Sequence, residues 1–191
     1  MGGVHRGGDP DGLGGLFEDL EQQAEALELA EREAEVADRA HTEYRAVGLV
    51  ERLQASVGAR VRLEVTGPGT VAGRLTRVGA DCAFVTEESD ALRARSWVVA
   101  LAHVTEVAGA VAGAVAPDAW PVTARLGWAA ALRRIAEDQQ PCVLVRTDAR
   151  VVATRFTRVG ADFVEHLPDT PPDRTPLLTP LAAIAAVRSV G

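Results

Sequence analysis

The chain has 191 residues and a formal net charge of −7, and its charge is unevenly distributed. Between Glu18 and Glu43 ten acidic residues stand against two arginines, so the rest of the chain is close to neutral. A dedicated nucleic-acid-binding domain usually carries a basic excess, and this balance disfavours that class for the chain as a whole. All 20 basic residues are arginine and asparagine is absent, a composition typical of a GC-rich bacterial genome.

The two cysteines, Cys82 and Cys142, lie beside apolar residues and indicate reduced, buried thiols rather than a disulfide framework. The first residues form no apolar signal segment, and no apolar run reaches the roughly 18 residues of a membrane-spanning helix. We therefore expect a cytoplasmic protein that does not span a membrane.

The N-terminal quarter of the chain separates into two segments. Residues 1–12 are rich in glycine and predict a disordered tail. Residues 13–47 are dominated by Ala, Glu, Leu, Gln and Arg at helical spacing and predict a long acidic helical arm. Alanine fills most of its apolar stripe after the first turns, so a solvated helix that packs one narrow face is favoured over a coiled coil.

Residues 48–108 predict a small β module that begins with a short helix ending at Gly58. Alternating polar and apolar residues place one face of its first strand in the core. Gly73 in the second strand suits a sharp bend or bulge. The five predicted strands are Arg60–Val65, Val71–Val78, Cys82–Val85, Trp97–Leu101 and Val104–Val107.

Residues 109–124, rich in Gly, Ala, Val and Pro, predict a linker to a second module over residues 125–191. This module also starts with a helix, at residues 125–137, which carries an apolar stripe. Five strands are predicted in the same order: Cys142–Arg146, Val151–Val159, a third that begins with Phe163 and Val164, Leu177–Leu181 and Ile184–Val187.

An internal repeat is the strongest signal in the sequence. The octapeptide Arg74–Asp81, R-L-T-R-V-G-A-D, recurs at Arg155–Asp162 as R-F-T-R-V-G-A-D, with seven of eight positions identical. Such self-similarity identifies a duplicated structural unit. Leu75 and Phe156 are expected in the core, and the arginines and threonines beside them are expected in solvent.

The order of elements in each module resembles a known family. A helix, five short bent strands, a long loop between the third and fourth strands and a final corner of the form V-x-L-A-x-V-x-x-V resemble the Sm-like barrel of bacterial Hfq and the Lsm proteins. The resemblance covers about Gly48–Val107 and Arg125–Val190. It implies a mainly β fold with helices: two tandem Sm-like five-stranded barrels, each preceded by a short helix, plus the long N-terminal acidic helix. SH3-like barrels share much of the pattern and are the alternative.

The RNA-binding residues of that family are not matched in this chain. Sm and Lsm proteins bind a uridine base with an aromatic or His residue and an Asn after the Asp that starts the third strand, and with an Arg-Gly pair before the last strand. Here Asp81 is followed by Cys-Ala-Phe and Asp162 by Phe-Val-Glu, while the corners begin at Leu101 and Leu181 and contain no Arg-Gly. The resemblance therefore does not carry the RNA pocket with it.

No catalytic, cofactor-binding or metal-binding pattern is visible in the sequence. The four histidines are scattered and none pairs with a Cys or Ser motif, so we expect a non-enzymatic protein without a cofactor or metal. Solvent-facing polar residues of the repeated segments are the candidate contacts for nucleic acid or a partner, although an ordinary strand surface would show the same residues after duplication. They are Arg74, Thr76, Arg77, Arg155, Thr157 and Arg158.

The leading functional hypothesis is an assembly or adaptor protein whose barrel edges pair within or between chains, by self-association or with a protein partner. The acidic arm would recruit or shield. The alternative is an RNA- or DNA-binding regulatory protein that uses the outward arginines. The candidate edge residues for assembly are Trp97, Val99, Leu101, Leu178 and Leu181.

Overall fold

The structure is a computed structural model, and it describes residues 22, 25, 27–29, 31–35, 38, 44–87, 95–169 and 175–190. The chain divides into two compact units, Met1–Val47 and Gly48–Gly191. The predicted tail at residues 1–12 lies outside the described residues.

The N-terminal unit holds helical residues, but its longest described helical stretch is only residues 31–35. Arg32 donates to the carboxylate of Glu28 at 3.0 Å, an exposed pair of the i,i+4 type. Leu27 and Leu29 are exposed, so the described part buries no apolar face of the kind that stabilises helices in proteins. The prediction of a long N-terminal helix over residues 13–47 is therefore wrong for the described part of this unit.

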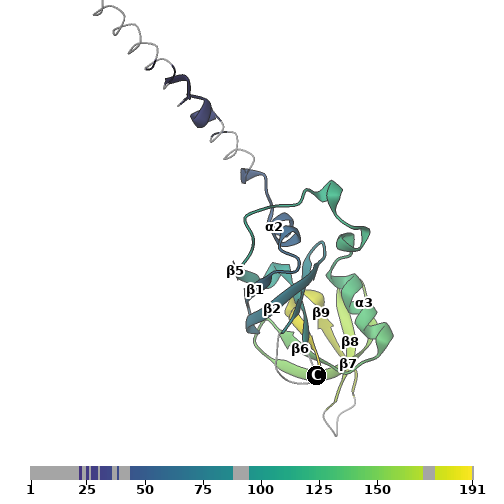
Figure 1. Ribbon diagram of the computed structural model, residues 1–191. Helices are drawn as coiled ribbons and strands as arrows, with labels where there is room; N and C mark the ends of the chain where they lie inside the picture. The colour runs from purple at the N-terminus through teal and green to yellow at the C-terminus, as the bar shows by residue number, and fades with distance from the viewer. Residues whose placement is uncertain are drawn as a thin grey trace, which may run out of the picture. The chain divides into compact units, whose positions relative to one another are not determined.

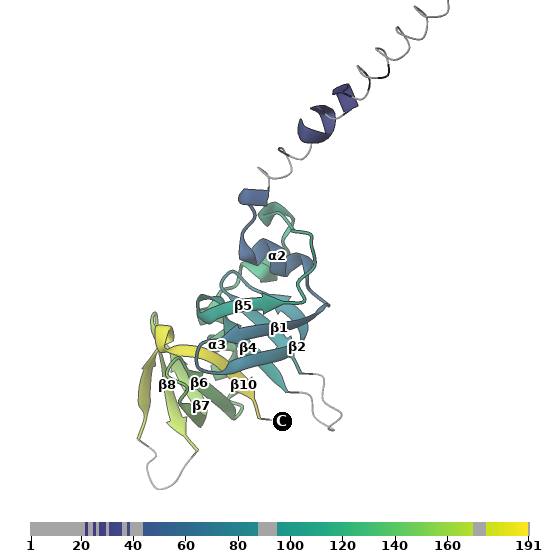
Figure 2. The same cartoon turned by 90° about the vertical axis from the view of Figure 1, so that its left-hand side faces the viewer.

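The second unit is built on one antiparallel sheet of ten strands (Figures 1 and 2). The strands of its first half are β1 (Arg60–Val65), β2 (Gly69–Val78), β3 (Cys82–Thr86), β4 (Ser96–Ala100) and β5 (Val104–Ala108). Those of its second half are β6 (Cys142–Arg146), β7 (Val151–Val159), β8 (Phe163–Pro168), β9 (Leu177–Pro180) and β10 (Ile184–Ser189).

The strands lie side by side in the order β5-β1-β2-β3-β4-β10-β6-β7-β8-β9. The second half thus repeats the order of the first, with β10 in the place of β5 and β9 in the place of β4. We call β5 and β9 the end strands, because each has a neighbour on one side only.

The predicted fold class, two separate Sm-like barrels, is wrong because the two halves share one open sheet. They join where β4 pairs with β10, and we call this pairing the internal seam. The prediction closed each set of five strands into a barrel of its own, whereas the hydrogen-bonding edge of β4 is used by a strand from the far end of the chain, within one open sheet. The paired residues are Val99 with Ala186, Val98 with Val187 and Trp97 with Arg188.

Two helices pack on the sheet, α2 (Leu49–Ala55) against β2 and α3 (Trp128–Asp138) against β7 (Figure 1). Leu53 of α2 and Leu132 of α3 are fully buried, each in the hydrophobic core of its own half. Burying such a side chain contributes about 1.5–3 kcal/mol to folding. Between β5 and α3 the chain forms two short 3-10 helices, Pro117–Ala119 and Val122–Arg125.

The two cores extend across the internal seam. Ala185 and Ala186 of β10 belong to the core of the first half, and Cys82 and Ala100 of the first half belong to the core under α3. Each half therefore completes the core of the other.

A side-chain contact also links the first half to α3. Asp81, at the end of the first octapeptide, accepts a hydrogen bond from the backbone N–H of Trp128, the first residue of α3. Gly127 precedes it, and a Cβ at that position would lie 2.9 Å from the Asp81 carboxylate. A carboxylate in this place satisfies a free N–H and interacts well with the helix dipole.

Gly73 has no room for a side chain. A Cβ there would lie 2.2 Å from the carbonyl oxygen of Thr86 and 3.0 Å from the Cα of Glu87, both backbone atoms. Close approach of another backbone therefore accounts for this glycine, since β2 pairs with β1 in regular register through Gly73.

We expect Gly73→Ala to lower the free energy of unfolding by about 1–3 kcal/mol, because the backbone must move to admit the methyl group. Urea denaturation followed by circular dichroism measures this change. Gly113→Ala is the control, since a Cβ at Gly113 meets only the Cβ of Ala55 at 3.8 Å. Equal free energies of unfolding for the two variants would contradict this steric explanation.

Candidate functional site

The first arginine of each octapeptide binds the end of a helix. Arg74 donates to the carbonyl oxygen of Gly58 at 2.6 Å, just beyond α2. Arg155 donates to the carbonyl oxygen of Gln139 at 3.3 Å, just beyond α3, and its Nε lies 3.7 Å from Asp169. Both arginines stabilise free carbonyl groups at helix C-termini, so their recurrence has a structural cause.

The threonine of each octapeptide occupies a β-bulge. The β2–β3 register skips Thr76, and the β7–β8 register skips Thr157. Their hydroxyl groups donate to the facing strand, Thr76 to the carbonyl oxygen of Phe84 at 3.2 Å and Thr157 to that of Glu165 at 3.0 Å. These hydroxyl groups therefore replace ladder bonds that the bulges remove.

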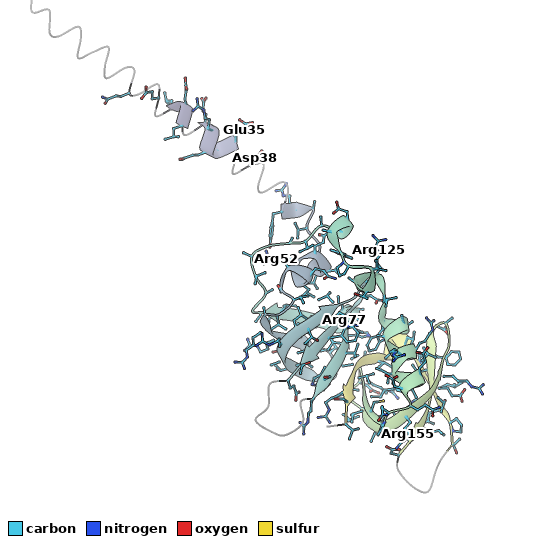
Figure 3. All side chains as sticks on the ribbon, turned by 45° about the vertical axis from the view of Figure 1, so that its right-hand side comes forward. Glu35, Asp38, Arg52, Arg77, Arg125 and Arg155 are labelled. Carbon is cyan, nitrogen blue, oxygen red and sulfur yellow. The ribbon has the colours of Figure 1, made fainter. Side chains whose placement is uncertain are left out.

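The second arginine of each octapeptide is differently placed. Arg77 and Arg158 are both exposed, and within the described ranges neither forms an ion pair. Arg77 lies over the ring of Phe84, with its guanidinium carbon 5.5 Å from the ring centre. Figure 3 shows Arg77 on the first half, well separated from Arg155 on the second.

Helix α3 lies between Arg77 and Arg158. On one side is a cavity of about 530 Å³, with an apolar floor that includes Ile135 and a rim that includes Arg77 and Arg133. On the other side is a cavity of about 400 Å³ lined by Arg133 and Arg158. We call Arg77, Arg133 and Arg158 the α3 arginines.

Charge along α3 is partly neutralised within the helix. Arg134 lies 3.3 Å from Glu137 and 3.3 Å from Asp138, in exposed ion pairs. Arg133 has no such pair in the part of the chain that the structure describes. The α3 arginines are thus placed to contact anionic groups such as phosphates, and Glu137 also lines both cavities.

The candidate edge residues of the first half are not at a free edge. Trp97 and Val99 lie in the internal seam, and Leu101 is buried at the 3-10 corner Leu101–His103. Trp97 donates from Nε1 to Glu87 at 2.6 Å, and Arg188 lies over its ring at 5.5 Å. Within this chain β10 already covers the edge that they form.

The candidate edge residues of the second half lie at an end of the sheet. Leu178 belongs to end strand β9 and is 65% exposed, beside Leu177 at 44%. Leu181 follows at the corner Leu181–Ala183 and packs against the second core. An apolar end strand of this kind is a site for pairing with another chain.

A buried polar network was missed from the sequence. His166 is 1% exposed, and its Nδ1 lies 2.9 Å from Oγ1 of Thr154 while its Nε2 lies 3.0 Å from Oγ1 of Thr179. The repeat held a signal, because the equivalent positions of the first half carry Gly73, Val85 and Val99. Three coordinated changes from small or apolar to polar indicate residues that act together.

Burial lowers the pKa of His166 below its ordinary value of 6.5. The folded chain therefore binds a proton on this group less readily than the unfolded chain. Its neutral form favours folding at pH values above 6.5, and this contribution is lost as the pH falls below that value.

We expect the variant His166→Val, which carries the valine found at the equivalent position 85, to lose less free energy of unfolding than wild type as the pH falls below 6.5. Urea unfolding in dilute solution at about pH 7.5 and about pH 5 measures this difference. Thr154→Val keeps the imidazole and should keep the acid-side loss while lowering stability at both pH values. An unchanged pH dependence in His166→Val would contradict the assignment.

The remaining chemistry of the described residues is sparse. Burial raises the pKa of both Cys82 and Cys142 to about 12, so these buried free thiols carry little thiolate. No group of three metal-binding side chains occurs within the described ranges. Nor does any helix among the described residues have the length and apolar character needed to cross a membrane.

Comparison with known proteins gives no match: no family model, no curated protein and no solved structure is similar enough to this chain. The family resemblance therefore rests on the sequence pattern alone.

Proposed function

We propose that this chain is a non-enzymatic assembly protein that extends its sheet by strand addition between chains. The observation that carries the proposal is the relation between the internal seam and the end strands. Inside the chain β4 pairs with β10, and the end strands β9 and β5 are the repeat equivalents of β4 and β10. The pairing that joins two halves within one chain can therefore recur between chains.

The composition of β9 supports this proposal. Leu177 and Leu178 expose large apolar side chains on a strand that has one free side. Exposed apolar end strands favour association, and many proteins block them with charge. Because the two end strands differ, the contact is head-to-tail and leaves the same two strands free at the ends of the assembly.

We expect the wild-type chain to show a mass that rises with concentration in size-exclusion chromatography with light scattering. Leu178→Arg should shift the population to monomer without lowering the melting temperature, because the side chain is 65% exposed. Val151→Arg is the matched control, since Val151 is 62% exposed but lies in β7, which has neighbours on both sides. A strictly monomeric wild-type chain, or equal disruption by both variants, would rule out assembly through β9.

A second candidate function is binding of nucleic acid, and the α3 arginines favour it. Three guanidinium groups without ion pairs in the described part of the chain flank one helix. They line two cavities that share Arg133, where they could contact phosphates, and Phe84 with its stacked Arg77 adds an aromatic surface.

In filter-binding titrations across a salt series, we expect the triple variant Arg77→Ala, Arg133→Ala, Arg158→Ala to bind nucleic acid more weakly. The slope of log affinity against log salt should fall by about 2–3, one counterion or slightly less for each lost phosphate contact.

The control removes three exposed arginines that lie outside the two cavities, with Arg62→Ala, Arg95→Ala and Arg150→Ala. Both variants change the net charge equally. Salt-dependent binding that is equal in the two variants would overturn the α3 site, and so would a wild-type chain that binds no nucleic acid.

A further inference from the structure

We propose that end strand β5 of one copy pairs with end strand β9 of the next in a single register, and that closing this junction takes up one proton shared among Glu106, Thr179 and His166. The inference rests on the proposed assembly function. It adds the partner, a second copy of this chain, and the regulation of the contact.

The repeat defines which residues of β5 and β10 are equivalent. In the first half Leu63 pairs with Val107, and in the second half Leu144 pairs with Val187. Leu63 and Leu144 lie 81 positions apart, the same interval as the two octapeptides. Val107 is therefore the counterpart of Val187.

The same reasoning relates β4 and β9. Ala83 pairs with Val99, and Val164, which lies 81 positions after Ala83, pairs with Thr179. Thr179 is therefore the counterpart of Val99. Transferring the register of the internal seam to the end strands gives three pairs between copies: Glu106 with Thr179, Val107 with Leu178, and Ala108 with Leu177.

The predicted junction and the internal seam differ in the polarity of one residue pair, and both members of the pair differ together. Inside the chain Ala186 faces Val99, and both are fully buried and apolar. At the end strands the corresponding residues are Glu106 and Thr179, one able to accept hydrogen bonds and one able to donate. Replacement of an apolar pair by a polar pair on both strands favours a second copy as the partner over an unrelated apolar strand.

Glu106 faces a like charge in the isolated chain. It lies directly opposite Glu64 in the β1–β5 pairing, and like charges at paired positions destabilise a sheet. Glu64 itself accepts from Thr70 at 3.0 Å and lies 3.7 Å from Nε of Arg62. Within the described ranges no hydrogen bond or ion pair involves the Glu106 side chain, so a donor from another copy would relieve it.

The hydrogens of the buried network can be counted. Thr154 has one hydroxyl hydrogen and donates it to the carbonyl oxygen of Leu167 at 2.7 Å. Nδ1 of His166, 2.9 Å away, must then carry the hydrogen of that contact, which leaves Nε2 as an acceptor. Thr179 donates its one hydrogen to Nε2.

This arrangement has no hydrogen left for Glu106. When the carboxylate of Glu106 approaches Thr179, the hydroxyl can donate to it only if Nε2 of His166 gains a proton and becomes the donor to Thr179. One proton is therefore taken from solvent, and the positive imidazole and negative carboxylate are bridged by the hydroxyl. A charged pair of this kind inside a closed junction requires such hydrogen bonds.

Within the described ranges no charged side chain forms a hydrogen bond or ion pair with His166. Its hydrogen-bond and ring partners there are Thr154 and Phe156 from β7 and Thr179 from β9. The carboxylate of its neighbour Glu165 lies 3.2 Å from the hydroxyl oxygen of Thr157 on β7. The carboxylate of the incoming copy, with Glu64 behind it, is thus the new charge that His166 would meet.

The test is the association constant as a function of pH, measured by sedimentation between about pH 8 and about pH 6. We expect wild-type association to strengthen by up to about tenfold for each unit by which the pH falls, the dependence of one linked proton. Glu106→Gln should associate with little pH dependence, because its amide N–H can donate to Thr179 without a proton from solvent. Asp118→Asn, which removes the same charge from an exposed site, should keep the wild-type dependence.

A second variant restores the composition of the internal seam. Glu106→Ala combined with His166→Val and Thr179→Val should associate independently of pH. Glu106→Ala alone should associate about tenfold more weakly than wild type at pH 6, because the charge-assisted hydrogen bond between the Glu106 carboxylate and the Thr179 hydroxyl is lost. Glu106 is exposed, so the single variants test the junction even where the triple variant is unstable. Wild-type association that does not change with pH would overturn the shared proton.

Cross-linking separates this failure from failure of the assembly itself. A chain with Ala108→Cys mixed with a chain carrying Leu177→Cys should form a disulfide between them, because the equivalent internal residues, Trp97 and Arg188, contact on one face of the sheet. The native thiols have a pKa of about 12 and contribute little background. A disulfide with pH-independent association rejects only the proton, whereas no disulfide and no association at any pH reject the junction and the proposed function together.

Discussion

The pairing of β4 with β10 is the contact on which the rest of this fold depends. Each half contains five strands, and neither closes its core alone: Ala185 and Ala186 fill the first core, and Cys82 and Ala100 fill the second. A half of this size buries too small a fraction of its surface to be more than marginally stable. The seam therefore supplies both hydrogen bonds and apolar burial, and it makes the two halves one cooperative structure rather than two linked modules.

Duplication followed by divergence explains why the two copies differ where they do. Within the chain the residues at the seam are small and apolar, as Ala186 opposite Val99 shows. At the ends of the sheet the corresponding positions carry Glu106 and Thr179, and the core behind Thr179 contains His166. Residues that pack the inside of each half, such as Leu63 and Leu144, stayed apolar. The two halves thus differ at their edges, where a contact selects its partner, and also in the core beside β9, where Thr154 and His166 stand in place of Gly73 and Val85.

The sequence predicts local features well because they depend on neighbouring residues. Leu75 and Phe156 were predicted in the core and are buried, and strand β1 alternates between core and solvent as its pattern indicates. The predictions that were wrong concern contacts between segments that are far apart in the sequence. Hydrophobic alternation identifies a strand but does not say which strand lies beside it, so the pairing of β4 with β10 and the single open sheet were missed. The network around His166 was missed for the same reason, since Thr154 and Thr179 approach it from other strands.

The repeated octapeptides show how conservation within one chain can mislead about function. Arg74 with Arg155 and Thr76 with Thr157 recur because each pair solves the same structural problem twice, at a helix end and at a bulge. Arg77 and Arg158 do not share such a contact: one stacks on Phe84, while the other lines the cavity at the far side of α3. Arg133 lies between them on a helix outside the repeated segment. A surface that combines one residue from each copy with one from the connecting helix belongs to the joined chain, and a single copy of the module could not form it.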